Sequence, residues 1–331
     1  MRAKPEPRES FLTQIRQQDP KLRVTALRRP RRRGPAPEAP IRARAVAVLI
    51  NEPTTMVFGD PFFAPLLKGM YEALTAHSML LVMLIPRNVA EMEFAKSYMI
   101  AGHVGGAILV SLHSRSSLPA QLLAEGLPVV CCGRPPLDTP ISYVDTDNRR
   151  GAEIATEHLI SLGRTKIATI SGDLDMPAAK DRLAGYRDAL ARAGIEPDPS
   201  LEELGDFVPD RAQMAMERLL INHPDVDGVF VSSDAMASAV VDVLHQAGKR
   251  VPEDVAVIGF DDTPVALTTR PQLSTMRQPI ESLGTESVNL LMQSMIDLQW
   301  EPQQSILEAE LVVRESTVGT PGPIVLSLPE S

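Results

Sequence analysis

From residue 46 onward, short apolar runs alternate with longer stretches whose apolar positions recur every three or four residues. The runs are rich in Val, Ile and Leu, as in Val46-Ala47-Val48-Leu49-Ile50, and predict strands buried on both faces of a parallel sheet. The stretches between them predict helices. In the first half, strands are expected at 46–50, 79–85, 105–111 and 127–132, and helices at about 60–76, 90–101 and 118–124.

A second series of the same kind follows Tyr143-Val144-Asp145. Its expected strands are 166–171, 226–231, 255–260, 273–278 and 306–313, and its expected helices are about 149–162, 178–193, 211–222, 234–247 and 280–299. Gly163, Gly194 and Gly248 follow three of these helices, where a C-terminal glycine is favoured. Regular β–α alternation predicts right-handed crossovers. We therefore expect an α/β fold of two similar Rossmann-like lobes with parallel sheets and a ligand cleft between them.

The composition agrees with a folded body, but the charge is unevenly distributed. The 331 residues are 44% hydrophobic and 23% charged, with a net charge of −9. The first 45 residues hold 13 Lys/Arg and 4 Asp/Glu, a balance of +9, so the other 286 carry −18. An acidic body repels nucleic acid and a basic segment attracts it. A domain boundary is expected near residue 45.

Residues 1–45 are cationic, proline-rich and poor in apolar periodicity, so we expect them to be largely disordered. A solvated tail is favoured over an arm that contacts DNA phosphates. In the arm interpretation, the contacts come from Arg28, Arg29, Arg31, Arg32 and Arg33. No part of the segment supplies three helices with apolar spacing, so it predicts no helix-turn-helix.

The sequence also indicates a compartment. No apolar run is long enough to span a bilayer, and Met1–Glu9 has no apolar region behind it, so neither membrane association nor secretion is expected. The only cysteines, Cys131 and Cys132, are neighbours in an expected strand and point to opposite faces, which disfavours a disulfide or metal site. A reducing cytoplasm is the simplest interpretation.

Polar residues follow several predicted strands, and the carboxyl ends of parallel strands border the ligand crevice. Asp262-Thr263-Pro264 resembles a helix cap, so Asp262 or Thr263 is expected to be structural. Asp261 has no such task and could accept hydrogen bonds from ligand hydroxyls.

Two other strand ends carry similar residues. Asp234 precedes a helix and is interpreted as its cap, which leaves Ser232 and Ser233 as possible polar contacts. Ser111 and His113 end a strand of the first lobe, but a lone histidine is more often a surface residue than a ligand contact.

Arg182 lies one turn into the helix expected from residue 178. It is either a surface arginine or a forked donor that reaches back into the cleft. Together with Asp261 it would supply the donor and acceptor that a sugar or polyol needs. Catalytic signatures are missing: there is no Gly-x-Ser-x-Gly, no phosphate-binding glycine loop and no His-Glu-x-x-His. We therefore expect a binding protein without enzymatic activity, cofactor or metal.

The segment Val255-Ala256-Val257-Ile258-Gly259-Phe260-Asp261-Asp262 resembles the signature of the lactose-repressor (LacI-type) bacterial transcription regulators. The resemblance runs from residue 46 to about 318. Further similar motifs stand in the family's order at residues 60–63, 144–148, 181–186, 233–237, 276–279 and 311–316.

The resemblance implies a periplasmic-binding-protein-like pair of lobes joined by three crossings, a homodimer, operator DNA and a small sugar-like effector. It implies an effector-binding and dimerisation domain at 46–318, with one lobe at 46–145 plus 275–302 and the other at 146–274 plus 303–318. Residues 319–331 are then a flexible tail. The effector contacts that it implies are Phe62, Ser111, Arg182, Ser233, Asp261 and Gln278, with Phe62 stacked on a ring or sugar face.

The family begins with a helix-turn-helix and a hinge helix, from which residues 1–45 depart. A sugar-responsive regulator core whose DNA-reading head is missing or degenerate is the leading hypothesis. The alternative is a solute-binding protein that serves a transporter without binding DNA. An enzyme is the least favoured class.

Overall fold

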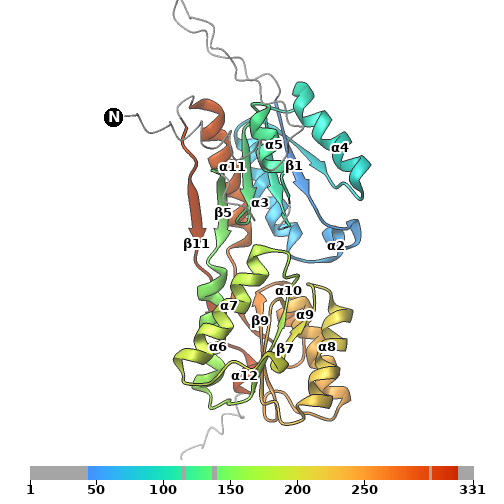
Figure 1. Ribbon diagram of the computed structural model, residues 1–331, viewed down its shortest axis with the longest axis vertical. Helices are drawn as coiled ribbons and strands as arrows, with labels where there is room; N and C mark the ends of the chain where they lie inside the picture. Colours follow the sequence, from blue (N-terminus) through green and yellow to red (C-terminus); the bar gives the residue numbers. More distant parts are fainter. Residues whose placement is uncertain (1–43, 114–115, 136–139, 298–299, 320–331) are drawn as a thin grey trace, which may run out of the picture.

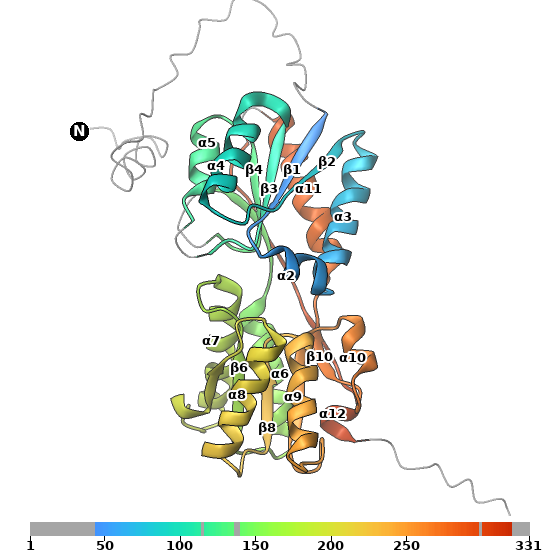
Figure 2. The ribbon, with the colours of Figure 1, turned by 90° about the vertical axis from the view of Figure 1, so that its right-hand side faces the viewer.

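The computed structural model describes residues 44–113, 116–135, 140–297 and 300–319. It shows two lobes one above the other along the longest axis of the molecule (Figures 1 and 2). The predicted basic segment, with its five arginines at 28–33, lies outside the described residues except for its last two positions. The predicted tail lies outside them except for Gly319.

The N-terminal lobe is built on a parallel sheet with the strand order β11-β5-β4-β3-β1-β2. Its strands are β1 (Ala45–Ile50), β2 (Leu80–Leu84), β3 (Gly106–Val110), β4 (Val129–Cys132), β5 (Ser142–Thr146) and β11 (Gln304–Leu307). Its helices are α2 (Thr54–Gly59), α3 (Phe63–Ala76), α4 (Val89–Tyr98) with the π-helical turn η1 (Met99–His103), α5 (Leu118–Ala124) and α11 (Ile280–Ile296). Alternate residues of β1 enter the two cores on opposite faces of the sheet, so helices cover both faces.

The C-terminal lobe repeats this architecture with the strand order β12-β10-β9-β8-β6-β7. Its strands are β6 (Ile167–Ser171), β7 (Glu202–Leu204), β8 (Gly228–Val231), β9 (Ala256–Asp261), β10 (Ser274–Arg277) and β12 (Glu310–Val312). Its helices are α6 (Asn148–Ser161), α7 (Pro177–Arg192), the 3₁₀ turn η2 (Pro199–Leu201), α8 (Pro209–Asn222), α9 (Asp234–Gln246), α10 (Pro264–Thr268) and α12 (Glu315–Val318). Only the β10–β12 pair is antiparallel among these described pairings. The predicted two-lobed α/β fold is confirmed.

The described chain crosses between the lobes three times, after β5, after β10 and after β11. The predicted lobe boundaries at 275 and 303 are wrong by one strand each. Strand β10 pairs with β9 in the C-terminal lobe, and β11 pairs with β5 in the N-terminal lobe. The run predicted as one strand over 306–313 is divided between two sheets, with Glu308 and Ala309 at the crossing.

The start of the first helix also differs from the prediction. Residues 54–59 form the unpredicted helix α2, and Asp60 is its C-cap rather than the start of the helix predicted over about 60–76. The Asp60 carboxylate accepts a hydrogen bond from the Phe62 amide at 2.9 Å, a local turn that competes with capping. Helix α3 then begins at Phe63, so Phe62 stands just before it, at the edge of the lobe.

Helices α3 and α11 approach closely because glycines face the partner backbone. A Cβ atom on Gly69 would lie 2.1 Å from the Glu281 carbonyl oxygen, whereas one on Gly59 would meet nothing within 4 Å. We expect Gly69→Ala to lower the free energy of unfolding by about 1–3 kcal/mol, the usual cost of overpacking. Urea unfolding tests this against the control Gly59→Ala. Equal stability of the two variants would contradict the close packing.

Among the described residues, no helix is long and apolar enough to cross a bilayer.

Candidate ligand-binding site

The carboxyl ends of the parallel strands of both lobes meet at one cleft. Each sheet contains the doubly wound strand order 2-1-3-4-5, read as β2-β1-β3-β4-β5 in one lobe and β7-β6-β8-β9-β10 in the other. Sheets of this order bind ligands at the carboxyl ends of their strands. The cleft encloses about 900 Å³ of space, counted out to its open mouth. All six residues predicted as contacts line it: Phe62, Ser111, Arg182, Ser233, Asp261 and Gln278.

Asp261 is the last residue of β9, and its side chain is buried at the floor of the cleft. Its Oδ1 accepts a hydrogen bond from Gln278 Nε2 at 2.6 Å and lies 3.6 Å from Arg182 Nη1. Its backbone has a φ of +111°, a conformation that residues other than glycine rarely adopt. Burial raises the pKa of Asp261 well above its ordinary value, against the opposing charge of Arg182. A ligand hydroxyl that donates to this carboxylate would favour its charged form.

Arg182 is 5% exposed, so it is not the surface arginine of the alternative interpretation. Its Nε donates to Asn148 Oδ1 at 2.9 Å, and Nη1 donates to the Ser232 carbonyl at 2.5 Å. The guanidinium lies 3.7 Å from the centre of the Phe260 ring, a favourable cation–π distance. The protein's own groups therefore fix the orientation of the guanidinium fork, with one of its faces packed on an aromatic ring.

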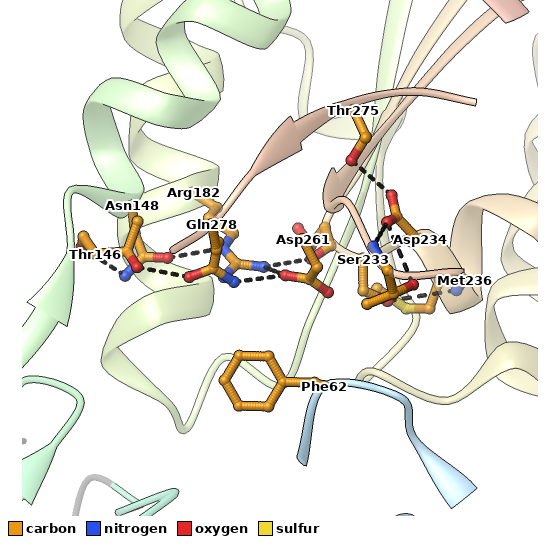
Figure 3. Close-up of polar contacts among 12 residues, drawn as sticks. Phe62, Thr146, Asn148, Arg182, Ser233, Asp234, Met236, Asp261, Thr275 and Gln278 are labelled. Atoms are coloured by element: carbon orange, nitrogen blue, oxygen red, sulfur yellow. Dashed lines mark hydrogen bonds and ion pairs between the residues drawn. The ribbon is translucent and has the colours of Figure 1, made fainter. Parts of the chain in front are cut away.

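Gln278 links the two lobes at the floor. Its Oε1 accepts from Thr146 Oγ1 at 2.7 Å, while its Nε2 donates to Asp261. Thr146 ends β5 and Gln278 follows β10, so this bond ties together two of the three crossings. Figure 3 shows these side chains in one row, with the Phe62 ring facing them.

The three remaining predicted residues line other walls of the cleft. Phe62 makes an edge-on contact with Phe63, with ring centres 5.5 Å apart, which leaves a face for stacking. Ser111 directly follows β3 and has a φ of +55°. Ser233 is the N-cap of α9, and its hydroxyl accepts from the Met236 amide. Ser232 is instead buried beneath the cleft as the carbonyl partner of Arg182.

Sequence reasoning missed several lining residues. Asp145 and Asn148 are buried, joined by a 3.0 Å hydrogen bond, and lie at the end of β5 and the start of α6. Burial raises the pKa of Asp145 to about 6. Glu52 follows β1 by two residues, so the strand-end rule that found Asp261 could have found it.

Two basic side chains of the N-terminal lobe face carboxylates of the other lobe. His113 lies between Glu52 of its own lobe, at 3.6 Å, and Asp173 and Asp175 of the other, at 3.6 and 3.8 Å. Arg134 forms an ion pair with Asp181 of α7. His113 therefore lies between the two lobes, which its interpretation as an ordinary surface histidine did not predict.

Carboxyl groups outnumber guanidinium groups in the lining of the cleft. Its described residues hold four carboxyl groups, Glu52, Asp60, Asp145 and Asp261, and two guanidinium groups, Arg134 and Arg182. Both guanidinium groups already face carboxylates. Within the described residues, no cluster of three His, Cys, Asp or Glu side chains is suited to a metal ion. The site thus offers hydrogen bonds and an aromatic face to an uncharged polar ligand.

A two-lobed parallel fold with a polar cleft defines a periplasmic-binding-protein-like receptor for a small molecule. Residues 156–317 match the family model described as a periplasmic binding protein-like domain. The HTH-type transcriptional regulator CelR of Thermobifida fusca is 42% identical over 278 residues, which cover 83% of this chain and 82% of that protein.

Solved structures agree with these sequence matches. A structure described as a transcriptional regulator CelR–cellobiose complex is 42% identical, with a TM-score of 0.80 over 82% of this chain and 84% of that one. A LacI family transcriptional regulator from Mycobacterium smegmatis has a TM-score of 0.72 at 26% identity, over 82% and 98%. The chain belongs to the LacI family of bacterial transcription regulators, and its two lobes form the effector-binding domain.

Proposed function

We propose that the effector of this regulator is an uncharged disaccharide, with cellobiose the first candidate, and that its binding between the lobes controls DNA binding. The observation that carries this proposal is the row of Arg182, Asp261 and Gln278 facing the Phe62 ring across the cleft (Figure 3). A sugar ring has hydroxyl edges and an apolar C–H face, which match a charged hydrogen-bonding floor and an aromatic wall.

The charge of the cleft argues for an uncharged sugar. Both guanidinium groups among the described lining residues already face carboxyl groups, so neither is free to bind the phosphate of a phosphorylated sugar or the carboxylate of an acidic one. The relative for which a complex with cellobiose is described shares 42% of its sequence with this chain, which supports a disaccharide over other uncharged polyols.

Calorimetric titration tests the proposal with cellobiose, glucose and glucose 6-phosphate. We expect saturable binding of cellobiose, weaker binding of glucose, which fills only part of the cleft, and none of glucose 6-phosphate. Tightest binding of the phosphorylated sugar would contradict the charge argument. No binding of cellobiose would contradict the effector assignment.

The pH dependence of binding should reveal the contact of His113 with the other lobe. The neighbouring Glu52 carboxylate, and more weakly Asp173, raise the pKa of His113 above its ordinary value. Asp173 and Asp175 face His113 only while the lobes are close, so closure raises this pKa and protonation favours closure. That contribution is complete below the pKa of the open form and is lost as the pH rises through the raised pKa.

The His113 contribution should therefore tighten the binding of an effector between the lobes at low pH. Because Asp173 and Asp175 are partly exposed, we expect this contribution to change cellobiose affinity by only about two- to fivefold between about pH 6 and about pH 8.5. Calorimetry in both buffers measures it. The variant His113→Asn should remove most of the difference, and an unchanged pH profile in that variant would contradict the assignment.

The remaining parts of the proposal concern the whole protein. We infer that it acts in the cytoplasm as a homodimer without enzymatic activity, and that the arginines at 28–33 are candidate phosphate contacts. An electrophoretic shift assay over a salt series tests the DNA part, because contacts to phosphates alone give salt-steep binding that is indifferent to sequence. The second candidate is a solute-binding protein, which detection of the protein outside the cytoplasm would favour.

A further inference from the structure

Asp234 was interpreted from the sequence as a helix cap, but the structure gives that role to Ser233. Asp234 is the first residue of α9, is 0% exposed and does not line the cleft. Its Oδ2 accepts a hydrogen bond from the Thr263 amide at 2.7 Å, and its Oδ1 accepts from Thr275 Oγ1 at 2.6 Å. One carboxylate thus joins α9 to β10 and to the turn after β9.

The backbone of that turn adopts an energetically unfavourable conformation. Asp261 and Asp262 both have positive φ angles, +111° and +57°, although neither is glycine. Strand β9 fixes the chain before them, and the Thr263 amide is the first backbone donor after them. The Asp262 carboxylate points to Arg277 and Arg314, at 2.7 and 2.6 Å. The turn is therefore held at its far end by Asp234 and at its middle by two arginines.

Strand β9 leaves room for the Asp234 carboxylate at Gly259. A Cβ atom on Gly259 would lie only 2.4 Å from Asp234 Oδ1, so a larger residue there would displace the acid. Burial raises the pKa of Asp234 to about 7, against the hydrogen bonds from Thr275 and Thr263. A buried acid is expensive to retain, and its hydrogen bonds here all go to the elements around the turn.

We propose that Asp234 is a positioning residue of the effector site: it holds the Asp261–Asp262 turn in the conformation that presents the Asp261 carboxylate to the cleft. Figure 3 shows Asp234 on the far side of Asp261 from Gln278, joined to Thr275. The inference rests on the proposed function, because it assigns affinity for the effector to a residue that does not touch it.

The test compares three variants by calorimetry with cellobiose, each at a temperature well below its melting temperature. Asp234→Ala removes the acceptor of the Thr263 amide and should weaken binding by about tenfold or more. Asp234→Asn keeps one oxygen for that amide and can donate its NH₂ to Thr275, so binding should stay within about threefold of wild type. Asp242→Ala, an exposed aspartate of the same helix, should bind as wild type.

A merely structural role would lower the melting temperature and leave the affinity of the folded protein unchanged. Wild-type affinity in folded Asp234→Ala, or an equal loss in the Ala and Asn variants, would therefore overturn the proposal. If Asp234→Ala does not fold, Thr275→Val decides. It removes the hydroxyl donor at Oδ1 and should weaken binding by about three- to tenfold, and wild-type affinity would overturn the proposal.

A measurement without ligand separates this inference from the effector assignment. Amide exchange at Thr263, followed by NMR, should accelerate by about tenfold or more in Asp234→Ala and remain near wild type in Asp234→Asn. If the wild-type protein does not bind cellobiose, the proposed function fails. The amide exchange rates at Thr263 then test by themselves whether Asp234 holds the turn. Unchanged exchange at Thr263 in the Ala variant would then overturn it.

Discussion

Replacing Asp261 by asparagine is expected to weaken cellobiose binding by about 10- to 100-fold, the usual value of a hydrogen bond to a charged group. The Asp261 carboxylate lies at the floor of the cleft, held by Gln278 and facing Arg182. Asparagine has nearly the same shape, so it should fit the turn. Its amide, however, carries no charge and offers the sugar one acceptor atom instead of two.

Calorimetry on the folded variant measures this loss. The matched control is Asp225→Asn, which alters an exposed carboxylate paired with Lys166 in the C-terminal lobe and outside the cleft. We expect the control to bind cellobiose as the wild type does. Equal affinity of Asp261→Asn and wild type would show that the effector does not use the floor of this cleft.

Arg182→Ala is expected to abolish cellobiose binding and to lower the free energy of unfolding by about 3–5 kcal/mol, as when one partner of a buried ion pair is removed. The variant leaves Asp261 buried without its countercharge and leaves the Ser232 carbonyl and Asn148 Oδ1 without their donor. It also empties the space above the Phe260 ring. Because whole domains are stable by only about 5–15 kcal/mol, the fold should persist with a reduced margin.

Urea unfolding monitored by circular dichroism measures the stability of this variant. Arg182→Lys serves as the comparison, since it keeps the charge but loses the planar fork, and should fall between Ala and wild type. An unchanged unfolding midpoint for Arg182→Ala would contradict the view that this arginine organises the floor of the cleft.

The secondary structure was largely predictable where a buried strand is an uninterrupted apolar run, as in β1, β3 and β8. Strands β5 and β7 were not predicted, because polar residues interrupt the first and make up most of the second. The pattern could not assign strands to sheets: β10 and β11 are similar short strands, and only the crossings place one in each lobe. Helix α2 was missed because it is short and ends on the local turn at Asp60.

Some residues of the site were predictable from the sequence pattern and others only from the resemblance to a family. Asp261 is the last residue of a strand, Ser111 and Ser233 follow strands, and parallel strands bring their ends together. Phe62 and Gln278 were implied only by the resemblance to the LacI family. The distances between partners in the sequence explain what was missed. A helix cap is recognised within a few residues, whereas Asp234 bonds Thr263 and Thr275, which are 29 and 41 positions away.

The most direct test of the account is a crystal structure of the protein with cellobiose. We expect the disaccharide between the lobes, with one ring against Phe62 and a hydroxyl oxygen at about 2.5–3.0 Å from an Asp261 carboxylate oxygen. Cellobiose bound at another place, or an interlobe cleft without sugar in crystals of protein that binds cellobiose in solution, would contradict the assignment of this cleft as the effector site.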